Sequence, residues 1–224
     1  MRALLTDIEG TTTSVSFVYD TLFPYFREHF ESYAHRGDPA LEDPLTEIIQ
    51  TVRTETGQTL TRGEAIGQAL AWAAADRKHT ALKTLQGLVW RHAYESGEIK
   101  GHVYDDVPPA LQRWKKSGLL LTVYSSGSVA AQQLLFRHSV AGDLTPFFSN
   151  YFDTTSGPKR EPASYRHIAA TLALPAADIL FLSDVVEELD AAHDAGLQTL
   201  QLVRPGTPPG IRHRTAPDFS VIQP

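Results

Sequence analysis

After Gly101 the sequence alternates between short apolar runs and longer amphipathic runs. The apolar runs predict strands at residues 119–124, 179–182 and 199–203, and the amphipathic runs predict helices at residues 110–117, 129–138, 165–174 and 187–195. Such alternation predicts a parallel sheet that is covered by helices on both faces. A further apolar strand ending at Asp7 would belong to the same sheet. The predicted fold class is therefore α/β.

Between Ser16 and about Ile99 helical signals dominate instead. Apolar and aromatic residues recur there at a spacing of three to four, namely Phe17, Tyr19, Leu22, Phe23 and Phe26. Breaks between several short helices are predicted at Pro24, Pro39, Pro44, Gly57 and Gly87. The predicted organisation is an α/β core made from residues 1–15 and 100–224, with an inserted helical cap at residues 16–99.

The composition excludes several classes of function. The chain has 224 residues, of which 42% are hydrophobic, which is enough for one or two domains with a substantial core. Its formal net charge is -6 and it has no segment dense in lysine or arginine, so nucleic acid is not an expected partner. No apolar run approaches the roughly 18 residues of a membrane span, and no signal peptide is recognisable. A soluble protein with a small polar substrate is expected.

The chain contains no cysteine. Disulfides, thiolate nucleophiles and cysteine-based zinc sites are excluded, so that a metal ion would need oxygen or imidazole ligands. The nine histidines show no metal-ligand spacing. The expected location is the cytoplasm, and a monomer is expected because no interface signal stands out.

The first predicted strand leads into Asp7-Ile8-Glu9-Gly10-Thr11. Side chains alternate along an extended segment, so Asp7 and Glu9 are expected on one side, with Ile8 pointing into the fold. Asp7 is the candidate nucleophile that would form an aspartyl phosphate. Glu9 is the candidate acid and base. The alternative is an ordinary acidic turn after a strand.

Three further polar segments follow predicted strands or lie in loops, at the edge where ligands bind in open α/β sheets. Ser125 to Ser128 could hold phosphate at a helix N-terminus, although Ser128 is equally a good N-cap. Lys159 could neutralise phosphate oxygens, although a lone loop lysine is usually solvated. Asp184 could ligate Mg²⁺, or else cap the following helix.

The order of these segments is more informative than any of them alone. Along the chain, a strand ending in the candidate nucleophile is followed by the helical insert, by serines at the end of a second strand, by a loop with a lysine and by an aspartate at the end of a third strand. These groups together make a phosphatase site. A metal ion and a lysine would reduce the repulsion between an anionic nucleophile and an anionic phosphate.

These motifs resemble those of the haloacid dehalogenase superfamily of phosphatases. That superfamily usually has aspartate at both acidic positions of the first motif, whereas this chain has Glu9 at the second. The variant resembles the enolase-phosphatases of methionine salvage, and the resemblance extends roughly from Asp7 to Val203. Other segments that match this family are Lys83–Trp90, Gly101–Val107, Tyr124–Val129, Phe152–Thr155 and Ser164–Arg166.

The resemblance implies a Rossmann-like parallel sheet with a helical cap and a two-step, Mg²⁺-dependent reaction. A 2,3-diketo-5-methylthiopentyl 1-phosphate would be enolised and then hydrolysed to 1,2-dihydroxy-3-keto-5-methylthiopentene, the acireductone. Asp7 and Asp184 would bind the metal through carboxylates, and Glu9 through its backbone carbonyl. Ser125, Ser126 and Lys159 would bind the substrate phosphate, with Lys159 also counted among the catalytic groups.

Some points stay open at this stage. Ser14-Val15 stands where the family commonly has proline and an aliphatic residue, and the tail after Pro205 carries no recognisable motif. The base for enolisation is not assigned, although Glu9 could serve in both steps. Phe17 and Trp90 could select the thioether tail or belong to the core. The alternative functions are a phosphatase of the same superfamily without enolase activity, and a non-catalytic binding protein on the same scaffold.

Overall fold

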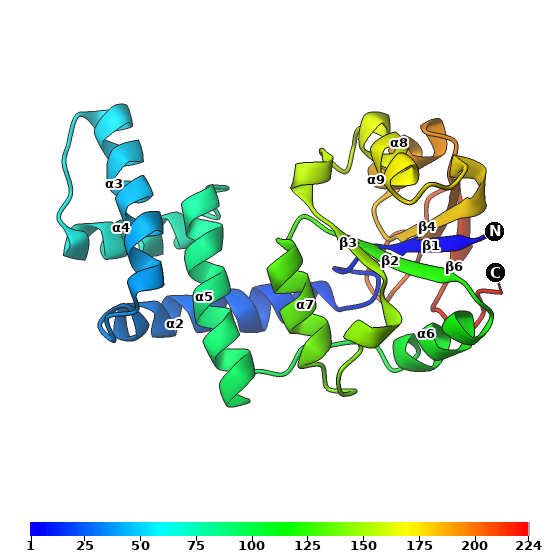
Figure 1. The fold of residues 1–224 in the computed structure, drawn as a ribbon, viewed down its shortest axis with the longest axis horizontal. Helices are drawn as coiled ribbons and strands as arrows, with labels where there is room; N and C mark the ends of the chain where they lie inside the picture. Colours follow the sequence, from blue (N-terminus) through cyan, green and yellow to red (C-terminus); the bar gives the residue numbers. More distant parts are fainter. Residues whose placement is uncertain (224) are drawn as a thin grey trace. The chain divides into compact units, whose positions relative to one another are not determined.

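The computed structural model describes residues 1–223 and divides the chain into two compact units (Figure 1). One unit consists of Met1–Val15 together with the chain from Lys100 onward, and the other consists of Ser16–Ile99. Each unit contains its own cluster of buried hydrophobic residues. We call them the core unit and the cap unit.

The core unit contains a six-stranded sheet in the order β3-β2-β1-β4-β5-β6, in which all paired strands are parallel. The strands are β1 (Ala3–Thr6), β2 (Leu120–Tyr124), β3 (Asn150–Phe152), β4 (Ile179–Ser183), β5 (Gln198–Leu202) and β6 (Arg214–Ala216). The first strand is central, with Thr6 opposite Val123 on one side and Leu182 on the other. All four residues of β1 are buried, as expected for a strand inside a parallel sheet.

Helices cover both faces of this sheet, which confirms the predicted α/β class. They are α6 (Val107–Lys116), α7 (Val129–Arg137), α8 (Pro162–Thr171) and α9 (Val186–Asp194). Figure 1 shows α8 and α9 on one side of the sheet and α6 on the other. Ala3 and Leu5 belong to the cluster that includes residues of α8 and α9. Because side chains alternate along a strand, Asp7 continues this row toward the same side.

The cap unit is helical. Its elements are α1 (Val15–Phe17), of which the first residue belongs to the core unit, a π-helical turn (Val18–Leu22), α2 (Phe23–Ala34), α3 (Glu42–Thr56), α4 (Arg62–Ala74) and α5 (Thr80–Ser96). Its apolar cluster is formed largely by α2 to α5 and includes Phe26, Phe30 and Trp72. Gly57 ends α3 in a left-handed conformation. The break predicted at Gly87 is wrong, because this glycine lies inside α5, where packing outweighs the weak helix propensity of glycine.

The predicted elements of the core unit have counterparts in the structure, with boundaries that coincide or differ by at most three residues. The sequence did not predict β3 and β6, which have three residues each. Short 3-10 turns were also not predicted, and they lie at Pro39–Leu41, Thr145–Phe147, Thr154–Ser156 and Ala176–Asp178.

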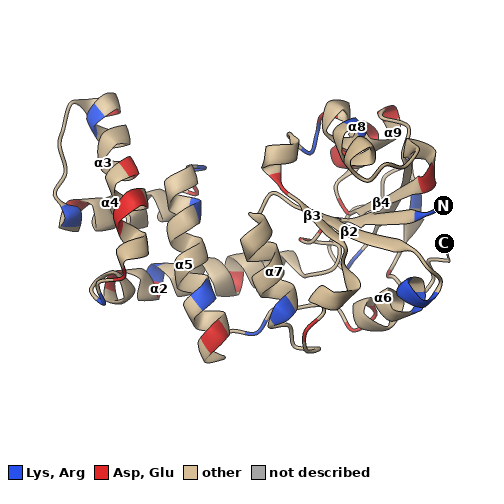
Figure 2. Cartoon of the chain, viewed as in Figure 1, with Lys and Arg blue, Asp and Glu red and all other residues tan. Residues whose placement is uncertain are grey.

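None of the helices within residues 1–223 is both long enough and apolar enough to cross a membrane. Acidic and basic residues are interspersed along the helices of both units (Figure 2).

Candidate active site

A tight turn follows β1 and carries the first group of candidate residues. The Ile8 carbonyl accepts hydrogen bonds from the backbone N–H groups of Thr11, Thr12 and Thr13, at 3.2, 2.9 and 2.9 Å. Because the strand ends at Thr6 and the chain then turns, the predicted alternation does not extend to Glu9. Asp7 is buried, whereas the Glu9 side chain is exposed.

Gly10 is required in this turn for two reasons. Its φ is +71°, in the left-handed region that favours glycine, and a Cβ atom there would overlap the carboxyl group of Asp184. The turn after β1 and the residue after β4 are therefore in close contact.

Asp7 forms an ion pair with Lys159 in the interior of the core unit. The Lys159 Nζ lies 2.6 Å from Asp7 Oδ1 and 2.6 Å from Glu188 Oε2. The lysine is only 9% exposed, so the alternative of a solvated loop lysine is wrong. Burial by itself would lower the pKa of Lys159, but the charges of Asp7 and Glu188 outweigh burial, and its net pKa lies above the usual value. Lys159 is therefore a fixed cation beside Asp7.

Three hydroxyl groups hold the loop that carries Lys159. Tyr124 donates a hydrogen bond to the carbonyl of Gly157 at 2.8 Å, Ser164 to that of Pro158 at 2.7 Å, and Tyr165 to that of Lys159 at 2.7 Å. Three consecutive carbonyl groups are thus fixed from β2 and α8. This explains how a loop can hold a buried ammonium in one place.

Glu188 is the residue of this site that the sequence analysis missed. It lies in the first turn of α9, is 8% exposed, and accepts a hydrogen bond from the Ser183 hydroxyl at 3.1 Å. Burial and the neighbouring charge of Asp7 raise the pKa of Glu188 to about 7, although Lys159 opposes this. A signal was available, because Glu188 falls on the helix face that also carries Ala191 and Ala192, where a charged residue is unusual.

Asp184 follows β4 and lies against the turn after β1. Its Oδ1 atom is buried and has no hydrogen-bond partner among the described residues. Burial and the charge of Asp7 raise the pKa of Asp184 to about 6. The alternative role as a helix cap is wrong, because Val185 is the N-cap of α9 and its N–H group bonds to the Ser183 hydroxyl at 3.1 Å.

Ser125 and Ser126 follow β2, one strand away from Asp7. Ser125 is buried, and its hydroxyl accepts a hydrogen bond from the Gly127 N–H at 3.2 Å, whereas Ser126 is exposed. Ser128 is the N-cap of α7, as the alternative interpretation held. The Gln132 amide fixes this loop by donating to the carbonyls of Gly127 and Phe152, both at 2.8 Å.

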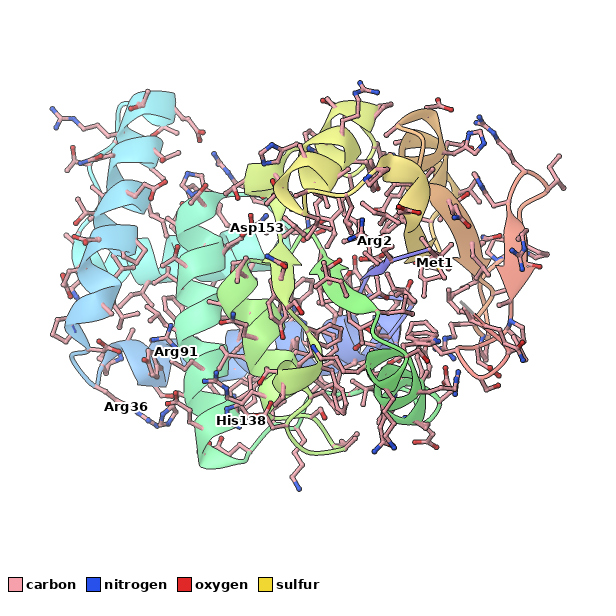
Figure 3. All side chains as sticks on the ribbon, turned by 45° about the vertical axis from the view of Figure 1, so that its right-hand side comes forward. Met1, Arg2, Arg36, Arg91, His138 and Asp153 are labelled. Atoms are coloured by element: carbon pink, nitrogen blue, oxygen red, sulfur yellow. The ribbon has the colours of Figure 1, made fainter. Side chains whose placement is uncertain are left out.

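The end of β3 supports the same loop. Asp153, labelled in Figure 3, follows this strand and accepts a hydrogen bond from the Val129 N–H at the start of α7, at 3.3 Å. Among the described residues, neither Ser125 nor Ser126 bonds directly to Asp7 or Lys159. They reach the same edge of the sheet because β2 pairs with β1.

The two aromatic residues considered for substrate selection lie in the cap unit. Trp90 is half-buried, donates its indole N–H to the Leu22 carbonyl at 2.9 Å, and stacks on Phe23 with ring centroids 6.2 Å apart. Phe17 is buried in α1. The indole N–H of Trp90 is thus already engaged inside the cap.

The donors around Asp7 fit a hard, oxygen-preferring cation. The Asp184 Oδ1 atom is buried without a hydrogen bond, which is costly unless another group compensates it. No group of three or more histidine, cysteine or acidic side chains within residues 1–223 is arranged to hold a metal. The ligand set predicted above uses only two side chains, Asp7 and Asp184, with the Glu9 carbonyl as a third donor.

The family model for haloacid dehalogenase-like hydrolases matches residues 1–196. A protein of Sorangium cellulosum named Enolase-phosphatase E1 is 52% identical over 227 residues, which span 100% of this chain and 97% of that protein. A protein of the same name from Pseudomonas aeruginosa is 56% identical over 209 residues, spanning 92% of this chain and 91% of that protein.

Solved structures are also similar to this chain. The crystal structure of the UTR4 protein of Saccharomyces cerevisiae superposes with a TM-score of 0.82 at 35% identity, covering 98% of this chain and 99% of that one. CbbY from Rhodobacter sphaeroides, solved in complex with phosphate, superposes with a TM-score of 0.60 at 19% identity, covering 99% and 96% of the two chains. The second likeness concerns the fold alone.

Proposed function

Because the chain belongs to the haloacid dehalogenase-like hydrolases, and among them to the enolase-phosphatases, we propose that it catalyses the enolase-phosphatase reaction of methionine salvage. The substrate is 2,3-diketo-5-methylthiopentyl 1-phosphate, which is enolised and then dephosphorylated to 1,2-dihydroxy-3-keto-5-methylthiopentene. The observation that carries the proposal is the buried contact of 2.6 Å between Asp7 and Lys159 at the end of the central strand.

Asp7 acts as the nucleophile of the phosphatase step. One of its carboxylate oxygens forms a bond to phosphorus while the bond from phosphorus to the ester oxygen breaks, and Glu9 gives a proton to the departing oxygen. Water then attacks the aspartyl phosphate, gives a proton back to Glu9, and releases inorganic phosphate and the free Asp7 carboxylate. The exposed position of Glu9 is compatible with its reaching a bound ester.

Lys159 supplies positive charge at the phosphoryl group. An ammonium that is held by fixed neighbours need not reorganise during the reaction, which is the basis of electrostatic catalysis in buried sites. Glu188 is the second carboxylate partner of Lys159, so that Asp7 is not the only group that holds the ammonium. Ser125 and Ser126 bind phosphate oxygens through the hydroxyl and N–H groups that precede α7.

Mg²⁺ is the proposed cofactor, held by the carboxylates of Asp7 and Asp184 and by the Glu9 carbonyl. When bound, it would supply further positive charge against the phosphoryl and enolate oxygens. The buried, unpartnered Oδ1 atom of Asp184 supports this assignment.

The test of the function uses the diketo phosphate with Mg²⁺ and follows the ultraviolet absorbance of the enol product together with phosphate release. An aryl phosphate serves as the generic phosphatase substrate. Enol formation followed by phosphate release is expected. Hydrolysis of the aryl ester without any enol signal would instead indicate a phosphatase for another small phosphorylated metabolite, and inactivity on all esters would indicate a binding protein.

Two variants separate the enolisation step from the phosphatase step. Asp7→Asn keeps the shape of the side chain but removes its nucleophilicity, so phosphate release should be abolished while the fold, followed by circular dichroism, is retained. Glu9→Gln should slow departure of the ester oxygen. If the enol still forms in Glu9→Gln, a group other than Glu9 removes the proton in the first step.

We further propose that the protein acts as a monomer in the cytoplasm on this small-molecule substrate. The lack of cysteine is typical of a protein that does not depend on disulfides in an oxidising compartment. Light scattering after size-exclusion chromatography tests the oligomeric state, and fractionation of cells tests the location.

A further inference from the structure

Arg204 follows β5 and is buried, with a side chain that is 5% exposed. Its guanidinium donates to the Thr11 carbonyl from Nε at 3.1 Å and from Nη2 at 2.9 Å. The same group pairs with both carboxylate oxygens of Asp106, from Nη1 and Nη2, each at 2.8 Å. Thr11 belongs to the turn that carries Asp7 and Glu9, although it lies 193 positions before Arg204.

The surroundings hold the guanidinium in one orientation. It lies 4.0 Å from the centroid of the Tyr104 ring and 5.5 Å from that of Phe219. Asp106 also accepts a hydrogen bond from the Phe219 N–H at 2.8 Å, so the segment after β6 closes over the pair. A bidentate pair with these further contacts is a rigid arrangement.

The turn after β1 depends on outside contacts at its distal end. Within the turn, the backbone bonds of Thr11, Thr12 and Thr13 all converge on the Ile8 carbonyl, and Gly10 donates to Thr13 at 2.7 Å. Two carbonyls are held from elsewhere in the core unit, that of Thr11 by Arg204 and that of Thr12 by the Tyr104 N–H at 3.0 Å. Only the first of these contacts comes from a side chain and can be removed by substitution.

We propose that Arg204 is a positioning residue for the reaction, acting through the Thr11 carbonyl to set the backbone of the turn that carries Glu9. The inference deepens the proposed function, since it concerns how the same site is assembled. It also gives a role to the end of β5, which contributes no candidate catalytic group. Gln201 on the same strand donates to the Asp184 carbonyl at 3.0 Å, so β5 supports both acidic segments.

The experiment compares Arg204→Lys with Arg204→Met. Lysine keeps the positive charge for Asp106 but lacks the planar fork that reaches Thr11. We expect both variants to lose about tenfold or more in kcat with KM changed by less than about twofold, because groups that orient catalytic residues commonly act on that scale. The control is Arg113→Lys, since Arg113 donates to the Phe219 carbonyl at 3.1 Å and so contacts the same C-terminal segment without touching the turn.

All kinetics are measured well below each variant's Tm, with folding checked by circular dichroism. If Arg204 only balanced the charge of Asp106, Arg204→Lys would keep the wild-type kcat. This result would overturn the proposal. Equal losses of kcat in Arg204→Lys and Arg113→Lys would also overturn it, since docking of the C-terminal segment would then be the cause.

If neither Arg204 variant folds, Asp106→Asn provides the second test. It leaves the arginine in place but removes one half of its bidentate partner, so kcat should fall by about threefold or more. Wild-type kcat in Asp106→Asn would contradict the proposal. Each measurement is a ratio to the wild type on whichever ester the wild type hydrolyses, so a failure of the proposed function shows in the wild type and not in these ratios.

Discussion

At the scale of single residues, the site brings three carboxyl groups, those of Asp7, Asp184 and Glu188, close to one buried ammonium. Asp7 and Glu188 contact Lys159 directly, and burial together with the charge of Asp7 raises the pKa of Asp184. Two of these acids, Asp184 and Glu188, have pKa values raised above their ordinary range. Such raised values make ionisation of the site dependent on pH near neutrality.

The first prediction concerns stability and Glu188. Its pKa is about 7 in the folded protein and near its ordinary value of 4.5 in the unfolded chain. Between these two pH values Glu188 is protonated in the folded protein but ionised in the unfolded chain. The stability that this proton contributes is therefore present at low pH and is lost as the pH rises through about 7. Glu188→Gln should remove a pH-dependent contribution to the free energy of unfolding on the order of 1 to 3 kcal/mol.

The measurement is urea unfolding at pH 5 and pH 8 in metal-free buffer, followed by circular dichroism. From pH 5 to pH 8, the free energy of unfolding should fall more in the wild type than in Glu188→Gln. Glu187→Gln is the matched control, because Glu187 is the exposed neighbour in the same helical turn. If the pH-dependent change is the same in wild type and Glu188→Gln, Glu188 is not the titrating group.

The second prediction concerns Mg²⁺ and Asp184. The pKa of Asp184 is raised to about 6, so below that pH a proton occupies the carboxyl group that is proposed to bind the metal. Mg²⁺ affinity should therefore fall by about tenfold per pH unit below about pH 6 and level off above pH 7. Isothermal titration calorimetry at pH 5, 6 and 7.5 measures this. An affinity that does not change over this range would exclude Asp184 as a ligand.

At the scale of elements, the loop between β3 and α8 is ordered by side chains of its neighbours. The hydroxyls of Tyr124, Ser164 and Tyr165 bind three successive carbonyls that end at Lys159. The position of Lys159 is thus set by β2 and α8.

The third prediction follows from this arrangement. Tyr165→Phe leaves the buried carbonyl of Lys159 without its donor, which should cost about 1 to 3 kcal/mol of stability. It should also lower kcat by about threefold to tenfold, because Lys159 loses a fixed position. Denaturant unfolding and steady-state kinetics measure the two effects.

Tyr151→Phe is the matched control for that prediction. The Tyr151 hydroxyl is buried in β3 and has no hydrogen-bond partner among the described residues, so its removal should not reduce stability. Equal losses in the two variants would show that the hydroxyl of Tyr165 has no special role.

The elements that could be predicted from sequence are those with a strong period or a long apolar run, such as the stretch that forms β4 and the face of α7. The strands β3 and β6 could not be predicted, because three residues are too few to show a period and their pairing is decided by neighbours far along the chain. Arg204 could not be recognised either. Its partners are Thr11 and Asp106, and nothing local in the sequence shows that these three meet.

At the scale of the whole molecule, the two units have separate hydrophobic clusters. The fourth prediction uses this separation. Phe30 is fully buried in the cap cluster, and its ring stacks on Phe26 with centroids 4.8 Å apart. Phe30→Ala should destabilise the cap unit by about 3 to 5 kcal/mol.

Hydrogen exchange distinguishes a local from a global effect. In Phe30→Ala, amides of α2 to α5 should exchange faster, while amides of β1, β2 and β4 should keep their wild-type protection. The reciprocal variant Phe181→Ala, in the cluster of the core unit, should show the opposite pattern. Equal acceleration in both units for either variant would show that the chain unfolds as one cooperative body.

The central place of β1 in the sheet has a consequence for biosynthesis. This strand is translated before the rest of the sheet, yet its two neighbours are β2, which starts at Leu120, and β4, which starts at Ile179. At typical rates of synthesis, roughly ten to thirty seconds separate the translation of β1 from that of β4. Until β4 has been made, at least one edge of this apolar strand lacks its partner, and an unpaired edge of this kind is prone to aggregation during folding.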